Sequence, residues 1–195
     1  MREEPDVWTL NGRSTKFSSA KVYRTLIGHQ ATEPVFRWIW KNFCQPKQKV
    51  FIWLLLKDKL STRNILRSKN MHLDSTNYEW CNTGSEETSE HLFFHCPFAQ
   101  ACWGMFNLET IQDGTVLENF SAFKIQLDSQ FFMETIILIR WVIWTAKNEL
   151  IFRNNQMNLS DCRTSFFKEG KLIGLRVKDN LSFLFDQWIE SLELI

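Results

Sequence analysis

The sequence predicts a mainly α-helical fold: a small helical domain with an N-terminal β-hairpin and a loop rich in Cys and His. Three observations support this class. Apolar residues recur at helical spacing over residues 130–153, the longest periodic run in the chain. Pro34 and Pro46 each stand where a first helical turn would begin. Asn11 and Gly12 lie between two short apolar segments, a pattern typical of a hairpin turn.

The other elements follow from turn residues and capping residues. The hairpin is predicted within residues 1–17. The apolar residues of the segment that begins at Pro46 nearly encircle the helix axis, which indicates a buried central helix. Residues 107–128 are weakly patterned and are predicted to include a loop at Asp113 and Gly114. The last helical region is expected to begin at Ser160 and to be interrupted near Gly170 or Asn180. The predicted helices cover residues 20–27, 35–43, 46–59, 63–68, 97–107, 130–153 and 160–194.

Composition limits the class of protein. A chain of 195 residues with 44% hydrophobic residues fits one domain, or one domain with a small appendage. Nine Trp and seventeen Phe indicate a large aromatic core. The net charge of +1 indicates no particular partner, but residues 1–80 hold fourteen Lys and Arg against seven Asp and Glu. The first part of the chain is therefore basic and the rest acidic.

The cysteines and the apolar segments bear on localisation. Five Cys residues, an odd number, and a charged start without a secretory leader indicate a reducing compartment. The most apolar stretch, residues 131–144, contains Glu134 and Arg140 and is shorter than the roughly 20 residues that a membrane span requires. We therefore expect an intracellular protein without membrane contact, with the nucleus as a candidate compartment.

Cys81, His91 and Cys96 form the most informative motif, with the spacing Cys-x9-His-x4-Cys. Thiolate and imidazole are the ligands that tetrahedral zinc takes, and a structural zinc site normally has four of them. The motif supplies three candidate ligands. The alternative is that Cys81 and Cys96 are ordinary buried thiols, because free Cys is often buried.

A Cys at position 78 would complete the pattern Cys-x2-Cys-x9-His-x4-Cys. With that change the segment resembles the reverse transcriptase zinc-binding domain of plant non-LTR (LINE-type) retrotransposons. The resemblance implies a zinc-knuckle-like loop within residues 18–107, a C-terminal helical extension over 108–195 and a role in handling nucleic acid. It extends to segments at 50–56, 60–62, 141–144, 147–148 and 151–152.

The chain departs from the family pattern at Tyr78, which stands where the family has its first Cys. A phenol has a reference pKa of about 10 and stays protonated near neutral pH, so Tyr78 is a poor zinc ligand. The sequence therefore predicts a degenerate zinc site. His72, His95 and Cys102 are the candidates for the fourth position.

Basic residues are concentrated between Arg37 and Lys69, where nine Lys and Arg face one acid, Asp58. Such a strip is suited to the phosphates of RNA or DNA. Trp38, Trp40 and Phe43, if exposed, could stack on unpaired bases. The alternative is that the aromatic residues belong to the core and the lysines solvate helix exteriors. The candidate nucleic-acid contacts are Arg37, Lys41, Lys47, Lys49, Lys57, Lys59, Arg63 and Arg67.

Catalytic motifs do not occur in the sequence. It has no Tyr-x-Asp-Asp of a polymerase, no glycine-rich phosphate loop and no His-Glu-x-x-His. Glu86, Glu87 and Glu90 are expected to form a solvated acidic turn, with a metal-dependent nuclease as a minor alternative. We therefore expect a non-catalytic module that binds nucleic acid and has no small-molecule substrate. The main alternative is a helical structural or protein-interaction domain, a relic that has lost zinc.

Overall fold

The computed structural model describes residues 18–28, 33–73, 75, 77, 81, 84–111 and 114–195. These residues form helices and no strand, and an isolated antiparallel bridge joins Asn77 and Glu86. The predicted mainly α-helical class is therefore confirmed. The hairpin predicted within residues 1–17 lies outside the described residues.

The chain divides into two compact units, Met1–Glu33 and Pro34–Ile195. In the first unit, α1 (Ser19–Ile27) agrees with the predicted helix at 20–27. It ends at Gly28, whose φ of +75° lies in the left-handed region, where glycine is favoured because it has no Cβ.

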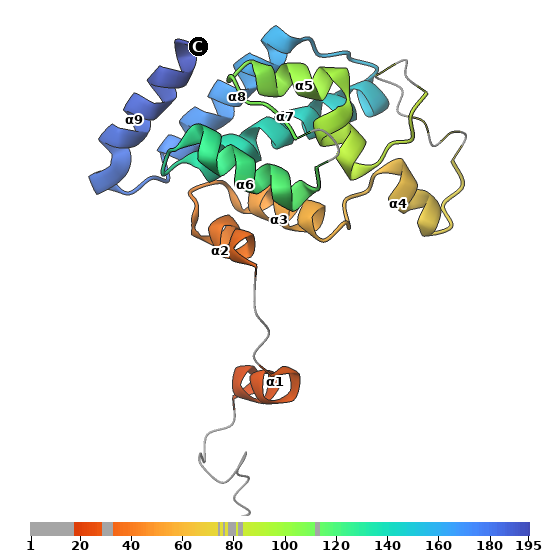
Figure 1. Ribbon diagram of the computed structural model, residues 1–195, viewed down its shortest axis with the longest axis horizontal. Coiled ribbons are helices and arrows are strands. Elements are labelled where there is room, and N and C mark those ends of the chain that lie inside the picture. The colour runs from red at the N-terminus through yellow and green to blue at the C-terminus, as the bar shows by residue number, and fades with distance from the viewer. Residues whose placement is uncertain are drawn as a thin grey trace, which may run out of the picture. The chain divides into compact units, whose positions relative to one another are not determined.

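The second unit contains the remaining helices (Figure 1). Pro34, Pro46 and Pro97 are each the first residue of a helix, a position where the missing N–H of proline costs no hydrogen bond. The region predicted at 160–194 forms two helices, and the first begins after Asn158 rather than Ser160. The elements are α2 (Pro34–Lys41), α3 (Pro46–Leu56), α4 (Arg63–Ser68), the π-helical turn η1 (His91–His95), α5 (Pro97–Gly104), α6 (Val116–Leu127), α7 (Phe132–Arg153), α8 (Leu159–Gly174) and α9 (Asp179–Glu193).

Helix α6 was not expected from the weak apolar pattern of residues 107–128. Its start is fixed by a capping box. The Thr115 hydroxyl accepts the Glu118 N–H at 3.2 Å, and a Glu118 carboxylate oxygen accepts the Thr115 N–H at 2.8 Å. Phe120 and Phe123 of α6 are buried in the core. The pairing satisfies two N–H groups that a helix start otherwise leaves unbonded, and Thr-x-x-Glu is its sequence signature.

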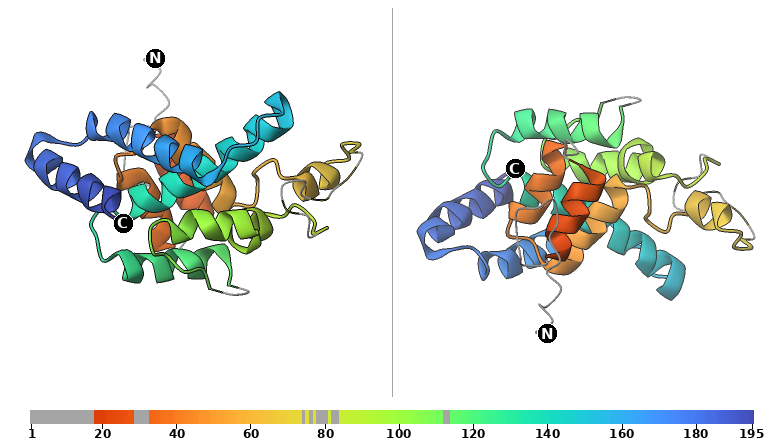
Figure 2. Two further views of the ribbon diagram at one scale, coloured as in Figure 1. Left: turned by 90° about the horizontal axis from the view of Figure 1, so that it is seen from above. Right: turned by 90° about the horizontal axis from the view of Figure 1, so that it is seen from below.

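The central helix of the second unit is α7. It contacts α3, α5, α6, α8 and η1, and its C-terminal end projects away from them in the two views of Figure 2. Every residue from Met133 to Arg140 is buried. The prediction that α3 would be the central helix is wrong in part, because Val50 and Trp53 are 45% and 37% exposed.

Phe51 of α3 joins three parts of the core. Its ring centroid lies 5.4 Å from that of Trp141 on α7 and 6.0 Å from that of Phe93 on η1, both edge-on. Phe93 of η1 therefore packs against α3. In the described part of the chain, no helix is both long and apolar enough to cross a membrane.

Arg140 is fully buried in the middle of α7. Its three guanidinium nitrogens have no hydrogen-bond partner among the described residues. Aromatic rings surround it instead: its Cζ lies 4.1 Å from the ring centroid of Phe120, 4.8 Å from that of Phe94 and 5.2 Å from that of Trp103. Burial holds the pKa of Arg140 well below its usual value.

Candidate metal centre

Helix α4 holds the two ends of the segment that carries Cys81. The bridge between Asn77 and Glu86 brings these ends together. The guanidinium of Arg63 donates to the Asn77 carbonyl at 3.0 Å, and that of Arg67 lies 2.7 Å from a carboxylate oxygen of Glu86. The cysteine segment is thus attached to a helix on both sides.

Glu87 fixes the same segment to α7. Its side chain is buried, and one carboxylate oxygen accepts the N–H of Arg63, the first residue of α4, at 3.1 Å. The same oxygen lies 2.5 Å from the ammonium of Lys147, whose side chain is 4% exposed. Burial lowers the pKa of Lys147, and the carboxylate of Glu87 opposes this shift. The expectation of a solvated acidic turn is therefore wrong for Glu87, although Glu90 is exposed.

The π-helical turn η1 brings the second and third ligands together. The Cys96 N–H donates to the His91 carbonyl at 2.8 Å, which closes a turn over five residues instead of the usual four. Leu92, Phe93 and Phe94 are buried in the core. Cys96 then becomes the N-cap of α5, just before Pro97. The x4 spacing between His91 and Cys96 is what this wider turn requires.

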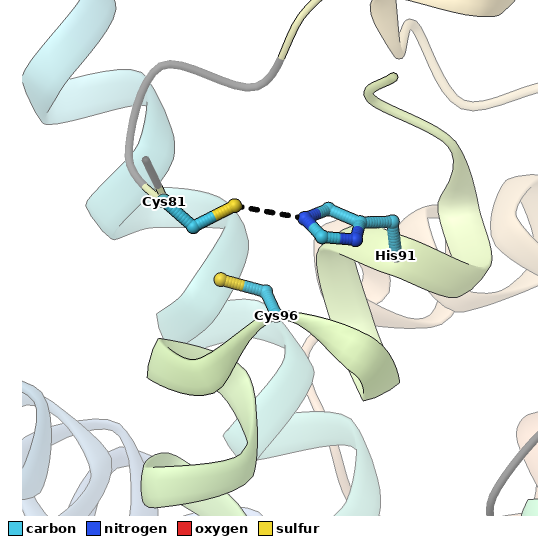
Figure 3. Close-up of side chains that lie close together, drawn as sticks. All are labelled: Cys81, His91 and Cys96. Atoms are coloured by element: carbon cyan, nitrogen blue, oxygen red, sulfur yellow. Dashed lines mark hydrogen bonds between the residues drawn. The ribbon is translucent and has the colours of Figure 1, made fainter. Parts of the chain in front are cut away.

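The three predicted ligands converge (Figure 3). Their donor atoms all lie within 4.8 Å of one another, and the Cys81 Sγ lies 2.9 Å from the Nε2 of His91. Zn–S bonds of about 2.3 Å and Zn–N bonds of about 2.0 Å place tetrahedral ligands roughly 3.5 to 3.8 Å apart. The donor set and its spacing therefore fit zinc after a small separation of Cys81 from His91.

The ligands differ in burial, and His91 is partly exposed. Cys96 is fully buried, and burial raises the pKa of its thiol to about 11, while the backbone N–H groups of Ala99 and Phe98 oppose this shift. Burial also lowers the pKa of His91, with a smaller contribution from His95. A divalent cation bound at this group would stabilise the thiolate form of its cysteine ligands.

The fourth ligand is not found among the described residues. Position 78 lies outside the described residues. Among the described residues, the group that could hold a metal ion consists of Cys81, His91 and Cys96 alone. His95 is near this group and has a buried Nε2 without a hydrogen-bond partner in the described part of the chain. Cys102 shares a hydrogen bond with Cys162. The fourth position stays open to a water or to a rotated His95 side chain.

Four of the eight predicted nucleic-acid contacts form ion pairs or hydrogen bonds within the chain. Besides Arg63 and Arg67, the ammonium of Lys47 lies 3.7 Å from Glu169, and that of Lys49 donates to the Asn42 carbonyl. These four cations support the fold directly, and their role towards nucleic acid stays a prediction.

The other four, Arg37, Lys41, Lys57 and Lys59, are exposed. Trp40 is 53% exposed, whereas Trp38 packs edge-on against Phe132 with centroids 5.4 Å apart. Residues three and four apart share a helix face, so Arg37, Trp40 and Lys41 form one exposed face of α2.

Fold and site together define a helical protein with a Cys₂His group suited to a metal. Residues 17–103 match the family described as zinc-binding in reverse transcriptase, a segment that contains all three ligands. No match is found among curated proteins or among solved structures. The chain is thus similar to this family over α1 to α5, and the predicted resemblance of segments between 141 and 152 lies outside the match.

Proposed function

We propose that the chain is a non-catalytic zinc-binding module of a reverse transcriptase polyprotein, from a plant LINE-type retrotransposon, and that it binds RNA or DNA inside the cell. The observation that carries this proposal is the convergence of Cys81, His91 and Cys96 within the segment that matches the family. The site is degenerate, because Tyr78 replaces one thiolate of the family pattern.

Zinc has a structural role in this proposal. The ion would link Cys81, whose segment is attached to α4 at both ends, to His91 of η1 and to Cys96 at the start of α5. Three protein ligands leave one coordination position for water, so binding is weaker than in a site with four protein ligands. No step of chemistry at the ion is required.

The purified protein is expected to contain about one equivalent of zinc, which the Cys96→Ser variant loses, because a structural site needs its thiolates. Elemental analysis measures both. Cys162→Ser is the matched control, since Cys162 is equally buried but lies outside the group. If His95→Ala also loses zinc, His95 is the fourth ligand.

A well-folded wild-type protein without zinc would contradict the metal role and favour the alternative of a helical structural or protein-interaction domain. The core allows this outcome. It is built around α7 by rings such as Phe51, Trp103 and Phe123, none of which is a ligand.

Nucleic-acid binding is proposed for the exposed face of α2. Arg37 and Lys41 flank Trp40 there, so two cations and an exposed ring occur together. Cations that neutralise phosphates give sequence-independent attraction, and an exposed indole can stack on a base. Lys57 and Lys59, which follow α3, extend the positive charge.

The double variant Arg37→Ala/Lys41→Ala is expected to bind single-stranded RNA more weakly and to lower the slope of log K against log salt by about 1 to 2, because two phosphate contacts are lost. Fluorescence anisotropy between about 50 and 200 mM salt measures this slope. Lys168→Ala/Lys171→Ala removes two exposed cations from α8 and serves as the control. Equal slopes for both double variants would place the phosphate contacts elsewhere.

A further inference from the structure

A pocket of about 520 Å³ lies between α4, the segment after it and the C-terminal half of α7. The metal ligands do not line it. The volume is within the range of small-molecule sites, about 300 to 1,000 Å³. Its wall includes Leu66, His72, Trp144, Asn148, Ile151 and Phe152.

The α7 side of the pocket offers an aromatic surface. Phe152 is 79% exposed and Ile151 is 39% exposed, although both are large apolar residues. The ring of Trp144 already has partners, because its centroid lies 6.0 Å from that of Phe51 and 4.5 Å from the ammonium of Lys147. Phe152 is the most exposed aromatic residue of the wall and is therefore the ring considered for a planar guest.

Asn148 supplies the polar part of the pocket. Its side chain is half-buried, and it makes no hydrogen bond with any residue in the described ranges. A carboxamide carries a donor and an acceptor side by side. The edge of a nucleobase offers the complementary acceptor and donor, and Asn is well suited to such pairs. A purely apolar guest would leave this amide without a partner.

Basic side chains form part of the wall of the pocket. Of the described residues that line it, none is acidic. Arg63 and Lys147 both belong to the wall, and both are paired with the carboxylate of Glu87. The exposed lysines Lys59 and Lys69 lie within three residues of lining positions. Nearby cations would attract the phosphates of a strand whose base enters the pocket.

We propose that this pocket takes one unpaired base of a single-stranded nucleic acid, stacked on Phe152 and hydrogen-bonded to Asn148. The inference rests on the proposed function, because the basic residues elsewhere in the chain provide the attraction to the phosphates. It goes further in naming the groups that contact a base and in explaining the exposure of Phe152.

The test compares two labelled strands by fluorescence anisotropy: an oligothymidine of about twelve nucleotides, within the usual site sizes, and an abasic strand with the same number of phosphates. The wild-type protein is expected to bind oligothymidine about tenfold more tightly than the abasic strand. Phe152→Ala and Asn148→Ala should each reduce this preference several-fold and leave the abasic affinity unchanged. Phe183→Ala is the control, since Phe183 is 71% exposed on α9 and does not line the pocket.

The outcomes separate the two proposals. If both strands bind equally, or if Phe152→Ala keeps the full preference, the pocket does not take a base, while the proposed function stands. If Phe152→Ala weakens both strands equally, stacking is also excluded. If neither strand binds at low salt, both proposals fall. Phe152 lies near the exposed end of α7, so far-UV circular dichroism should show an unchanged fold in its variant.

Discussion

Replacement of Lys147 by Met is expected to lower the free energy of unfolding by about 3–5 kcal/mol, the usual effect of breaking a buried ion pair by removing one partner. Glu87, whose side chain is only 1% exposed, would then keep Arg63, 3.9 Å away, as its charged partner and would lose the closer ammonium. The same change should loosen the attachment of the cysteine segment to α7. Urea unfolding followed by circular dichroism measures the free energy.

The double variant Glu87→Gln/Lys147→Met tests the cause of this loss. Gln keeps a carbonyl oxygen for the N–H of Arg63 but carries no charge, so most of the stability should return. Lys171→Met, an exposed lysine on α8, is the control and should change little. If the double variant is no more stable than Lys147→Met, the destabilisation comes from lost packing and not from the buried carboxylate.

Replacement of Arg140 by Met is expected to stabilise the protein, on the order of 2 kcal/mol, because a buried charge without a hydrogen-bond partner is costly. The ring faces of Phe120, Phe94 and Trp103 offset only part of this cost. Methionine has a similar length and a polarizable sulfur that packs well against rings. The midpoint of urea unfolding should therefore rise.

Arg163→Met provides a matched control with the opposite expected sign. The guanidinium of Arg163 donates to the carbonyls of Leu192 and Glu193 at 3.2 and 3.0 Å, so its removal leaves the end of α9 without these bonds. If Arg140→Met destabilises the protein as much as Arg163→Met does, the rings around Arg140 stabilise the guanidinium more than burial penalises it.

The sequence predicted most helices because their signals are local. The prolines at the starts of α2, α3 and α5 and the apolar period of residues 130–153 depend on neighbours along the chain. Helix α6 was missed because its apolar residues do not form one clean stripe: Ile125 is 80% exposed. The Thr115-x-x-Glu118 capping box was the visible signal.

The Cys₂His group was predicted for the same reason, since a spacing of five residues between His91 and Cys96 is a local pattern. The groups that hold the site in place were not predicted from the sequence. Glu87 and Lys147 are sixty residues apart, and no local pattern indicates that they meet. Lys147 is the one Lys in the apolar sequence of α7, which indicates a buried charge. Its partner Glu87 could be identified only from the fold.

Because α7 is the central helix, the part of the sequence that folds as a unit has to include it. This helix is about 33 Å long, from a rise of about 1.5 Å per residue. It lies beyond residue 103, where the similarity to the zinc-binding family ends. A gene fragment cut at that point would encode the ligands without Lys147 and would leave Phe51 without Trp141 and Trp144. Without α7 the Cys₂His group is therefore expected to lose part of the packing that supports it.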